Sequence, residues 1–195
     1  MFKRSSASSK PSQGSSKSAL APTQSRSPSS QHTTTDAGRD NGVRVEERGL
    51  YMVLWDTGVA NKYHWGLVIA QTNTSGVLYH QTLSGVQWRF VMENKNLSLS
   101  KSILVALKVG VLEKTNDEWL AAVKGIVRDV TVKDGNLTCR TWALAALYEL
   151  ASAGFIGMQP NWIHIHEIEE EAKKLAEDSK LFSAKFVLPS RQSKP

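Results

Sequence analysis

The chain of 195 residues has the length of one domain with an additional tail, and its 41% apolar and 22% charged residues are typical of a globular protein. A single cysteine excludes an intramolecular disulfide, and the lack of any run of 18 apolar residues predicts no transmembrane anchor. The net charge is +6, but residues 1–44 hold seven Lys or Arg against two Asp, so little of it remains for the rest of the chain. This distribution argues against a basic nucleic-acid-binding face on the folded part.

Residues 1–44 are rich in Ser, Thr, Pro, Gln and Lys and nearly lack large apolar side chains. Such a segment cannot bury enough surface to offset the entropy of ordering it, so we expect a disordered tail. No apolar segment follows Met1, which predicts no secretory signal and a cytoplasmic protein. We expect one domain over residues 45–189 and a frayed C-terminus over residues 190–195.

Five apolar segments between residues 50 and 109 predict an antiparallel sheet. Short turns such as Asp56–Gly58 and Ser84–Gly85 separate them, which is typical of a meander. The segments are Leu50–Trp55, Tyr63–Ala70, Val77–Gln81, Val86–Val91 and Ile103–Val109. A capped helix start at residues 115–118 then precedes an apolar stripe that ends near Val127.

The only cysteine, Cys139, lies where a second helix is predicted to begin. Asn136 and Thr138 are residue types that cap helices, so Cys139 should occupy the first turn, where free N–H groups and the helix dipole favour a thiolate. The alanine- and leucine-rich stretch that follows predicts a buried helix, and Gly154 is a natural end for it.

Beyond Pro160, isoleucines at positions 163, 165 and 168 precede a helix whose Glu- and Lys-rich part we expect to be a solvated face. His164 and His166 would share one side of a strand and could bind a metal there. No Cys and no third His accompanies them, so we assign them structural or surface roles and predict no metal. Phe186–Leu188 predicts a last strand or a frayed end.

Two of the remaining histidines, His64 and His80, lie on predicted strands joined by one hairpin and can therefore be neighbours across the sheet. A cysteine nucleophile needs a base within hydrogen-bond reach, and that base needs a polar group to orient it. With a shared register, both imidazoles would lie on the face against which the helix of Cys139 packs.

This order of motifs resembles the lecithin:retinol acyltransferase-like group of circularly permuted papain-like thiol enzymes, within the NlpC-type superfamily. That group has a strand with His-Trp-Ala/Gly, a hairpin, a second strand with His, a helix, and Asn-Cys at the start of a long helix. Tyr63–Gly66, Leu78–His80 and Cys139 follow this order, and the resemblance covers residues 49–155. Two departures concern the substrate pocket: Thr138 replaces the family's Asn, and Arg140–Trp142 replaces its Glu-His-Phe.

The resemblance implies an α+β, papain-like permuted fold in which about five antiparallel strands pack against the helix that carries the cysteine. It implies that Cys139 is the nucleophile, His64 its general base and acid, and His80 the orienting group, with the Cys139 N–H in an oxyanion hole. The expected activity is that of a cysteine-dependent hydrolase or acyltransferase. It would form a thioester with a small-molecule, lipid or peptide ester or amide and would need no cofactor.

Three alternatives remain open from the sequence. Permuted PPPDE-type peptidases, which remove ubiquitin-like or SUMO-like tags, share the order of His and Cys. A non-catalytic interaction module on the same fold would use tryptophans such as Trp55, Trp88 and Trp162 as anchors. Nucleic-acid binding through residues 1–44 is the third, and it would be strongly dependent on salt.

Overall fold

The computed structural model describes residues 42–132 and 135–193, and residues 1–41 of the predicted tail over residues 1–44 lie outside them. The described residues form an α+β unit with one six-stranded sheet and three helices. The strands are β1 (Gly49–Asp56), β2 (Tyr63–Ala70), β3 (Ser75–Ser84), β4 (Gln87–Asn96), β5 (Ile103–Val111) and β6 (Phe186–Pro189). The helices are α1 (Asp117–Arg128), α2 (Cys139–Ser152) and α3 (Trp162–Phe182).

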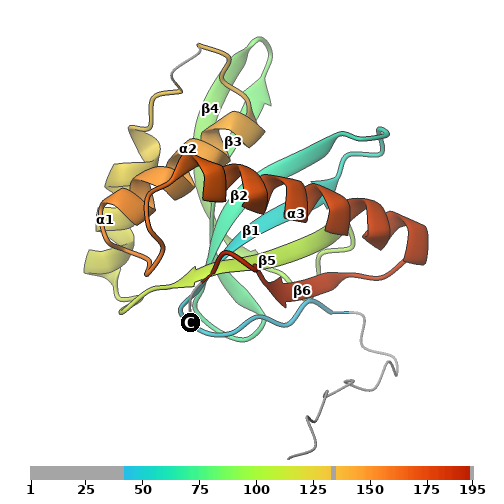
Figure 1. Cartoon of the computed structure of the whole chain (residues 1–195), viewed down its shortest axis with the longest axis horizontal. Helices are drawn as coiled ribbons and strands as arrows, with labels where there is room; N and C mark the ends of the chain where they lie inside the picture. The colour runs from blue at the N-terminus through green and yellow to red at the C-terminus, as the bar shows by residue number, and fades with distance from the viewer. Residues whose placement is uncertain (1–41, 133–134, 194–195) are drawn as a thin grey trace, which may run out of the picture. The chain divides into compact units, whose positions relative to one another are not determined.

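The sheet has the strand order β4-β3-β2-β1-β5-β6 (Figure 1). The first four strands form the predicted antiparallel meander, but β5 pairs with β1 rather than with β4, and β6 adds a parallel strand beyond β5. The reason is visible in the composition: β5 is apolar along nearly its whole length, so both of its faces need burial. β4 is polar and largely exposed, which suits the edge of the sheet.

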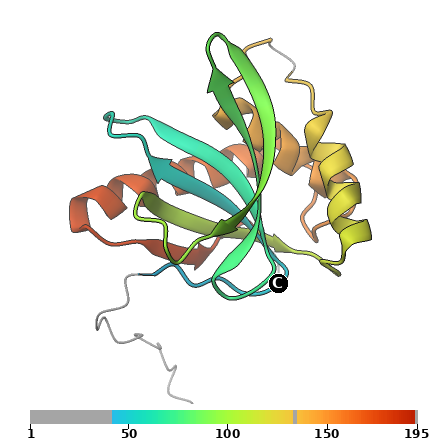
Figure 2. The ribbon, with the colours of Figure 1, turned by 180° about the vertical axis from the view of Figure 1, so that it is seen from behind.

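Two apolar cores lie on opposite faces of the sheet. Leu50, Met52 and Leu54 of β1 point into the larger core, which α2, α1 and α3 cover. The alternate residues of β1 point into a smaller core, to which Val43 and Val45 contribute from the segment before the sheet. Because Val43 is buried, the folded unit begins slightly earlier than the sequence predicts. Figure 2, seen from behind, shows the strands in front of the helices.

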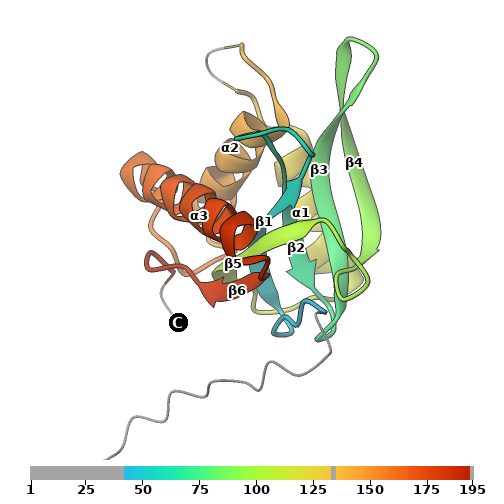
Figure 3. The ribbon, with the colours of Figure 1, turned by 90° about the vertical axis from the view of Figure 1, so that its right-hand side faces the viewer.

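Helix α2 is the buried helix that the sequence predicts. Eight of its 14 residues are buried, on most of its circumference, because the sheet, α1 and α3 surround it. The indole Nε1 of Trp142 donates a hydrogen bond of 2.9 Å to the carbonyl of Val127, which fixes α2 against the end of α1. Figure 3 shows α2 and α3 on one side of the sheet and the β3–β4 hairpin extending beyond the other strands.

The prediction of a strand around His164 and His166 is wrong, because both residues lie in α3. The buried stripe that begins at Ile165 and Ile168 has helical spacing, and this burial determines the structure of the whole segment. Residues two apart on a helix point in different directions, so the two imidazoles do not share a face. In the described part of the chain, no group of three or more His, Cys, Asp or Glu residues could hold a metal ion.

After α3 the chain returns to the sheet as β6. Ser190 is buried, and its hydroxyl donates a hydrogen bond of 2.7 Å to the carboxylate of Glu171 in α3, while its N–H bonds to the carbonyl of Lys108 in β5. These contacts hold the chain end against the folded unit beyond Pro189. None of the helices in residues 42–132 and 135–193 combines the length and apolar character that a membrane span requires.

Candidate functional site

His64 and His80 form a hydrogen-bonded pair on neighbouring strands. Gly66 of β2 pairs with His80 of β3, so His64 lies diagonally across from His80 on the same face. Nε2 of His64 is 2.7 Å from Nδ1 of His80, and the two rings meet edge to face. The ring of Trp55 in β1 lies 5.7 Å from His64 on its other side. The register therefore brings the two predicted histidines together.

The pair lies on the face of the sheet opposite to α2, which corrects the expectation that it faces this helix. Side chains alternate along a strand, and Trp65 and Leu67 of β2 point into the core that α2 covers. His64 lies between Tyr63 and Trp65 and points the other way, toward Trp55 and Leu78 of the smaller core. The sequence pattern alone did not distinguish the two faces of β2, because both are apolar further along the strand.

Cys139 is the first residue of α2, as the sequence predicts. Thr138 is the N-cap: its hydroxyl accepts a hydrogen bond of 3.1 Å from the N–H of Thr141. The hydroxyl of Thr141 accepts one of 2.9 Å from the N–H of Thr138 in return. This capping box fixes the first turn and with it the position of the sulfur.

The sulfur of Cys139 contacts the main chain of β2 on both sides of His64. Sγ lies 4.0 Å from the carbonyl oxygen of Tyr63, and the N–H of Trp65 is also directed at the sulfur. β3 pairs with β2 only from Gly66 onward, so residues 63–65 have no strand partner on that side. In the described part of the chain, no hydrogen bond joins the sulfur to either imidazole, and Nδ1 of His64 has no hydrogen-bond partner.

Burial keeps all three groups neutral near pH 7. Burial raises the pKa of the Cys139 thiol, although main-chain N–H groups and the charge of Arg140 act against this. Burial, assisted by His80 and by the charge of Lys95, lowers the pKa of His64 to about 4, and burial also lowers the pKa of His80. At this helix N-terminus desolvation therefore outweighs the helix dipole, and the resting site holds a thiol rather than the thiolate that the sequence predicts.

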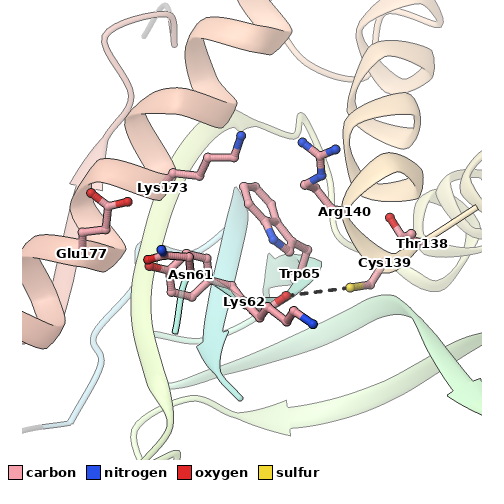
Figure 4. A pocket seen from close by; sticks show the side chains of 9 residues that line it. Asn61, Lys62, Trp65, Thr138, Cys139, Arg140, Lys173 and Glu177 are labelled. Carbon is pink, nitrogen blue, oxygen red and sulfur yellow. Dashed lines mark hydrogen bonds between the residues drawn. The ribbon is translucent and has the colours of Figure 1, made fainter. Parts of the chain in front are cut away.

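Cys139 opens onto a pocket between α2, α3 and the start of β2 (Figure 4). Its volume is about 350 Å³. The lining residues are Asn61, Lys62, Tyr63, Trp65, Thr138, Cys139, Arg140, Lys173 and Glu177. In Figure 4 the indole of Trp65 lies between the side chains of Lys173 and Arg140, with Lys62 below it.

Residues 47–186 match a family described as "Family of unknown function (DUF6914)". The chain belongs to this family. The matched segment begins just before β1 and ends at the first residue of β6, so it contains His64, His80 and Cys139. No curated protein and no solved structure matches the chain.

A charge cluster inside the DUF6914 segment fixes the wall of the pocket. Glu169 of α3 is 4% exposed and forms ion pairs with Arg140 of α2 and with Lys173, the latter at 2.5 Å. Burial raises the pKa of Glu169, but hydrogen bonds from Lys173, His166 and Arg140 outweigh burial and hold that pKa below its usual value. The first turn of α2 is thereby tied to α3.

The sequence-based assignment of Glu169 to a solvated face is wrong. Glu169 follows the buried Ile165 by four positions and is adjacent to the buried Ile168, so helical spacing places it on the packed stripe. This spacing is the signal that could have identified it.

The tryptophans predicted as interaction anchors differ in burial. Trp55 is buried, whereas Trp162 is half-buried and stacks on Tyr148 with ring centres 4.8 Å apart.

Proposed function

We propose that this protein is a cysteine-dependent hydrolase or acyltransferase of the permuted papain-like type, with Cys139 as nucleophile, His64 as general base and acid, and His80 as the orienting group. The observation that carries the proposal is the 2.7 Å bond between His64 and His80 beside the strand segment that the sulfur contacts. Covalent catalysis needs a base that is oriented by a third polar group and that reaches the nucleophile. The proposal therefore requires Nδ1 of His64 and the sulfur of Cys139 to come within hydrogen-bond reach when substrate binds, a contact that the described residues of the resting structure do not make.

The position of each group supports its proposed role. The sulfur is held by the rigid start of a capped, buried helix, and it contacts the residues on both sides of His64. His64 uses Nε2 for the bond to His80, which leaves Nδ1 for proton transfer. The N–H of Cys139 belongs to the first turn of α2, whose N–H groups have no partner within the helix, so it can donate to an oxyanion.

The reaction would proceed in two steps. Nδ1 of His64 takes the proton of the Cys139 thiol as the sulfur attacks the substrate carbonyl carbon, and the same proton leaves with the alcohol, thiol or amine that departs. A thioester on Cys139 remains. In the second step His64 takes a proton from water or an acceptor, whose oxygen or nitrogen attacks the thioester, and the proton returns to the departing sulfur. Water gives hydrolysis, and another acceptor gives acyl transfer.

The pKa values fix the starting protonation states of this mechanism, and they make the proton transfer unfavourable until substrate binds, because the pKa of His64 is lowered and that of Cys139 is raised. A neutral imidazole is a proton acceptor, and the lowered pKa of His64 keeps the ring in this form over the whole neutral range. The raised pKa of Cys139 keeps the sulfur protonated until a substrate arrives. The thiolate would then form only as the carbonyl is attacked, which protects a cysteine beside an open pocket from oxidation.

Acylation of Cys139 by an activated ester tests the proposal. We expect mass spectrometry of the full chain to show an acyl group on Cys139, absent in Cys139→Ser. In His64→Ala the acylation rate should fall roughly 100-fold, the lower range for loss of a general base. His164→Ala, a change of the same type in α3, should have the wild-type rate. The proposal would be wrong if wild type and His64→Ala were acylated at the same rate and were also alkylated by iodoacetamide at the same rate.

One observation favours a non-catalytic interaction module instead. The sulfur bonds to main-chain groups and its pKa is raised, which are properties of a structural cysteine. In that case Cys139 would serve to hold α2 against β2. The acylation experiment separates the two functions, because a structural cysteine has no reason to depend on His64.

A further inference from the structure

One nitrogen of the histidine pair is buried without a partner. Nε2 of His80 has no hydrogen bond, although the side chain is only 10% exposed and its other nitrogen bonds to His64. A buried polar group without a partner costs free energy, and native proteins rarely leave one. The carboxylate of Glu93 in β4 lies 3.9 Å from this nitrogen, slightly too far for a hydrogen bond.

The strand register places Glu93 on the same face as the histidines. Glu93 pairs with Leu78 of β3 and His80 pairs with Val91 of β4, so Glu93 and His80 are diagonal neighbours. The side chain of Glu93 is 43% exposed and so has room to rotate, and a hydrogen bond to Nε2 of His80 needs its oxygen to move closer by less than about 1 Å. Lys95, on the same strand and 3.6 Å from the same oxygen, competes for it.

The chemistry of these groups determines where the protons lie. A carboxylate only accepts hydrogen bonds, so it selects the form of His80 that carries a proton on Nε2. Nδ1 of that form is an acceptor, which requires the proton of His64 to be on its Nε2, since these two atoms are bonded. Nδ1 of His64 is then left with a lone pair.

We propose that Glu93 is a positioning residue that selects the Nε2-protonated form of both His80 and His64 and so makes Nδ1 of His64 the base. This rests on the proposed function, because only a reaction at Cys139 gives the base its use. Glu93 also stabilises the positive charge that the pair acquires when His64 takes a proton. Lys95 opposes this, and Trp55, on the β1 side, carries no charge.

The direct test is the proton position in each ring, measured by long-range 1H–15N NMR of the full chain at pH 7. Signals are assigned with His64→Gln and His80→Gln. We expect both rings in the Nε2-protonated form in the wild type. Glu93→Ala should give a mixture of forms, and Glu93→Gln should retain the wild-type form, because its carbonyl still accepts. Glu113→Ala, which removes an equal charge at an exposed site, is the matched control.

The midpoint of the pH profile of Cys139 acylation is a second measurement, and it would not change if Glu93 had only a structural role. Removal of the carboxylate in Glu93→Ala or Glu93→Gln makes His64 a weaker base, so the midpoint should move to lower pH and the plateau should fall roughly tenfold. Lys95→Met removes the opposing charge and should move the midpoint to higher pH. A change that only loosened β4 would lower the plateau in all variants and leave the midpoints together.

The outcomes separate the two proposals. Unchanged ring forms in both Glu93→Ala and Glu93→Gln, together with unchanged midpoints, would overturn the role of Glu93. Altered ring forms in Glu93→Ala without acylation of Cys139 in any variant, wild type included, would support the role of Glu93 in proton placement and overturn the enzymatic function. If Glu93→Ala fails to fold, the midpoints of Glu93→Gln and Lys95→Met decide.

Discussion

His64 is the residue whose chemistry is most altered by the fold. Its pKa is lowered from 6.5 to about 4, first by burial and then by the neighbouring charges of His80 and Lys95. Between these two pH values the unfolded chain binds a proton that the folded protein does not. The contribution of this neutral imidazole to stability is therefore complete above pH 6.5 and is lost as the pH falls toward 4.

This linkage predicts that the free energy of unfolding falls by about 1–2 kcal/mol between pH 7.5 and 5, after allowance for solvent around a partly buried ring. Urea titrations at the two pH values measure it. His64→Gln should reduce the difference to the part that His80 contributes, because burial also lowers the pKa of His80, whereas the control His164→Gln should leave the difference unchanged. Glu169 adds little to this change. Its pKa is 4.5 in the unfolded chain and lower in the folded protein, so at pH 5 the carboxylate is mostly ionised in both states. An equal pH dependence in His64→Gln would contradict the assignment.

Single residues differ in how well the sequence predicts them. Cys139, His64 and His80 stand out because their residue types are rare in this chain and their neighbours have clear helix or strand patterns. Glu93 and Glu169 do not stand out, because each is one of many acidic residues in a polar segment. Only the strand register and the burial of one side of α3 distinguish them.

The capping box of α2 is the element-scale feature on which the site depends. Thr138→Ala removes the hydroxyl that bonds to the N–H of Thr141, and we expect a loss of about 1 kcal/mol in urea titrations. The first turn should also fray, so acylation of Cys139 should slow. Asn116→Ala removes the corresponding cap of α1 and is the matched control. It should cost a similar free energy and leave Cys139 unaffected. An unchanged acylation rate in Thr138→Ala would show that the reactivity of Cys139 does not depend on this cap.

Elements were predicted well where the pattern is local. The apolar run Tyr63–Ala70 gives the bounds of β2, and the polar cap at Asn116 gives the start of α1. The position of β5 next to β1 was not predicted. Two strands that pair although they are far apart in the sequence share no local sequence pattern, and the only sign of a central position is that both faces of the strand are apolar. The sequence analysis considered His164 and His166 on a strand, because the alternate isoleucines Ile163 and Ile165 are as typical of a strand as of a helix.

At the scale of the whole molecule, the last strand completes the sheet. β6 covers the edge of β5, and Val187 packs on the smaller core. Deletion of residues 183–195 would leave the apolar edge of β5 open, so we expect a loss of about 2 kcal/mol and aggregation detectable by light scattering. Deletion of residues 192–195 keeps β6 and Ser190 and is the control. A soluble, equally stable chain after the longer deletion would show that β6 is dispensable.

The pairing of β5 with β6 joins parts of the chain that are about 80 residues apart in sequence. During translation, β5 leaves the ribosome long before β6 is made, and chains are synthesised at about 5–20 residues per second. The nascent protein therefore passes through several seconds in which this apolar edge is unprotected. A chaperone that binds extended apolar segments could bind this edge, and the sheet can be completed only after Phe186–Pro189 has been synthesised.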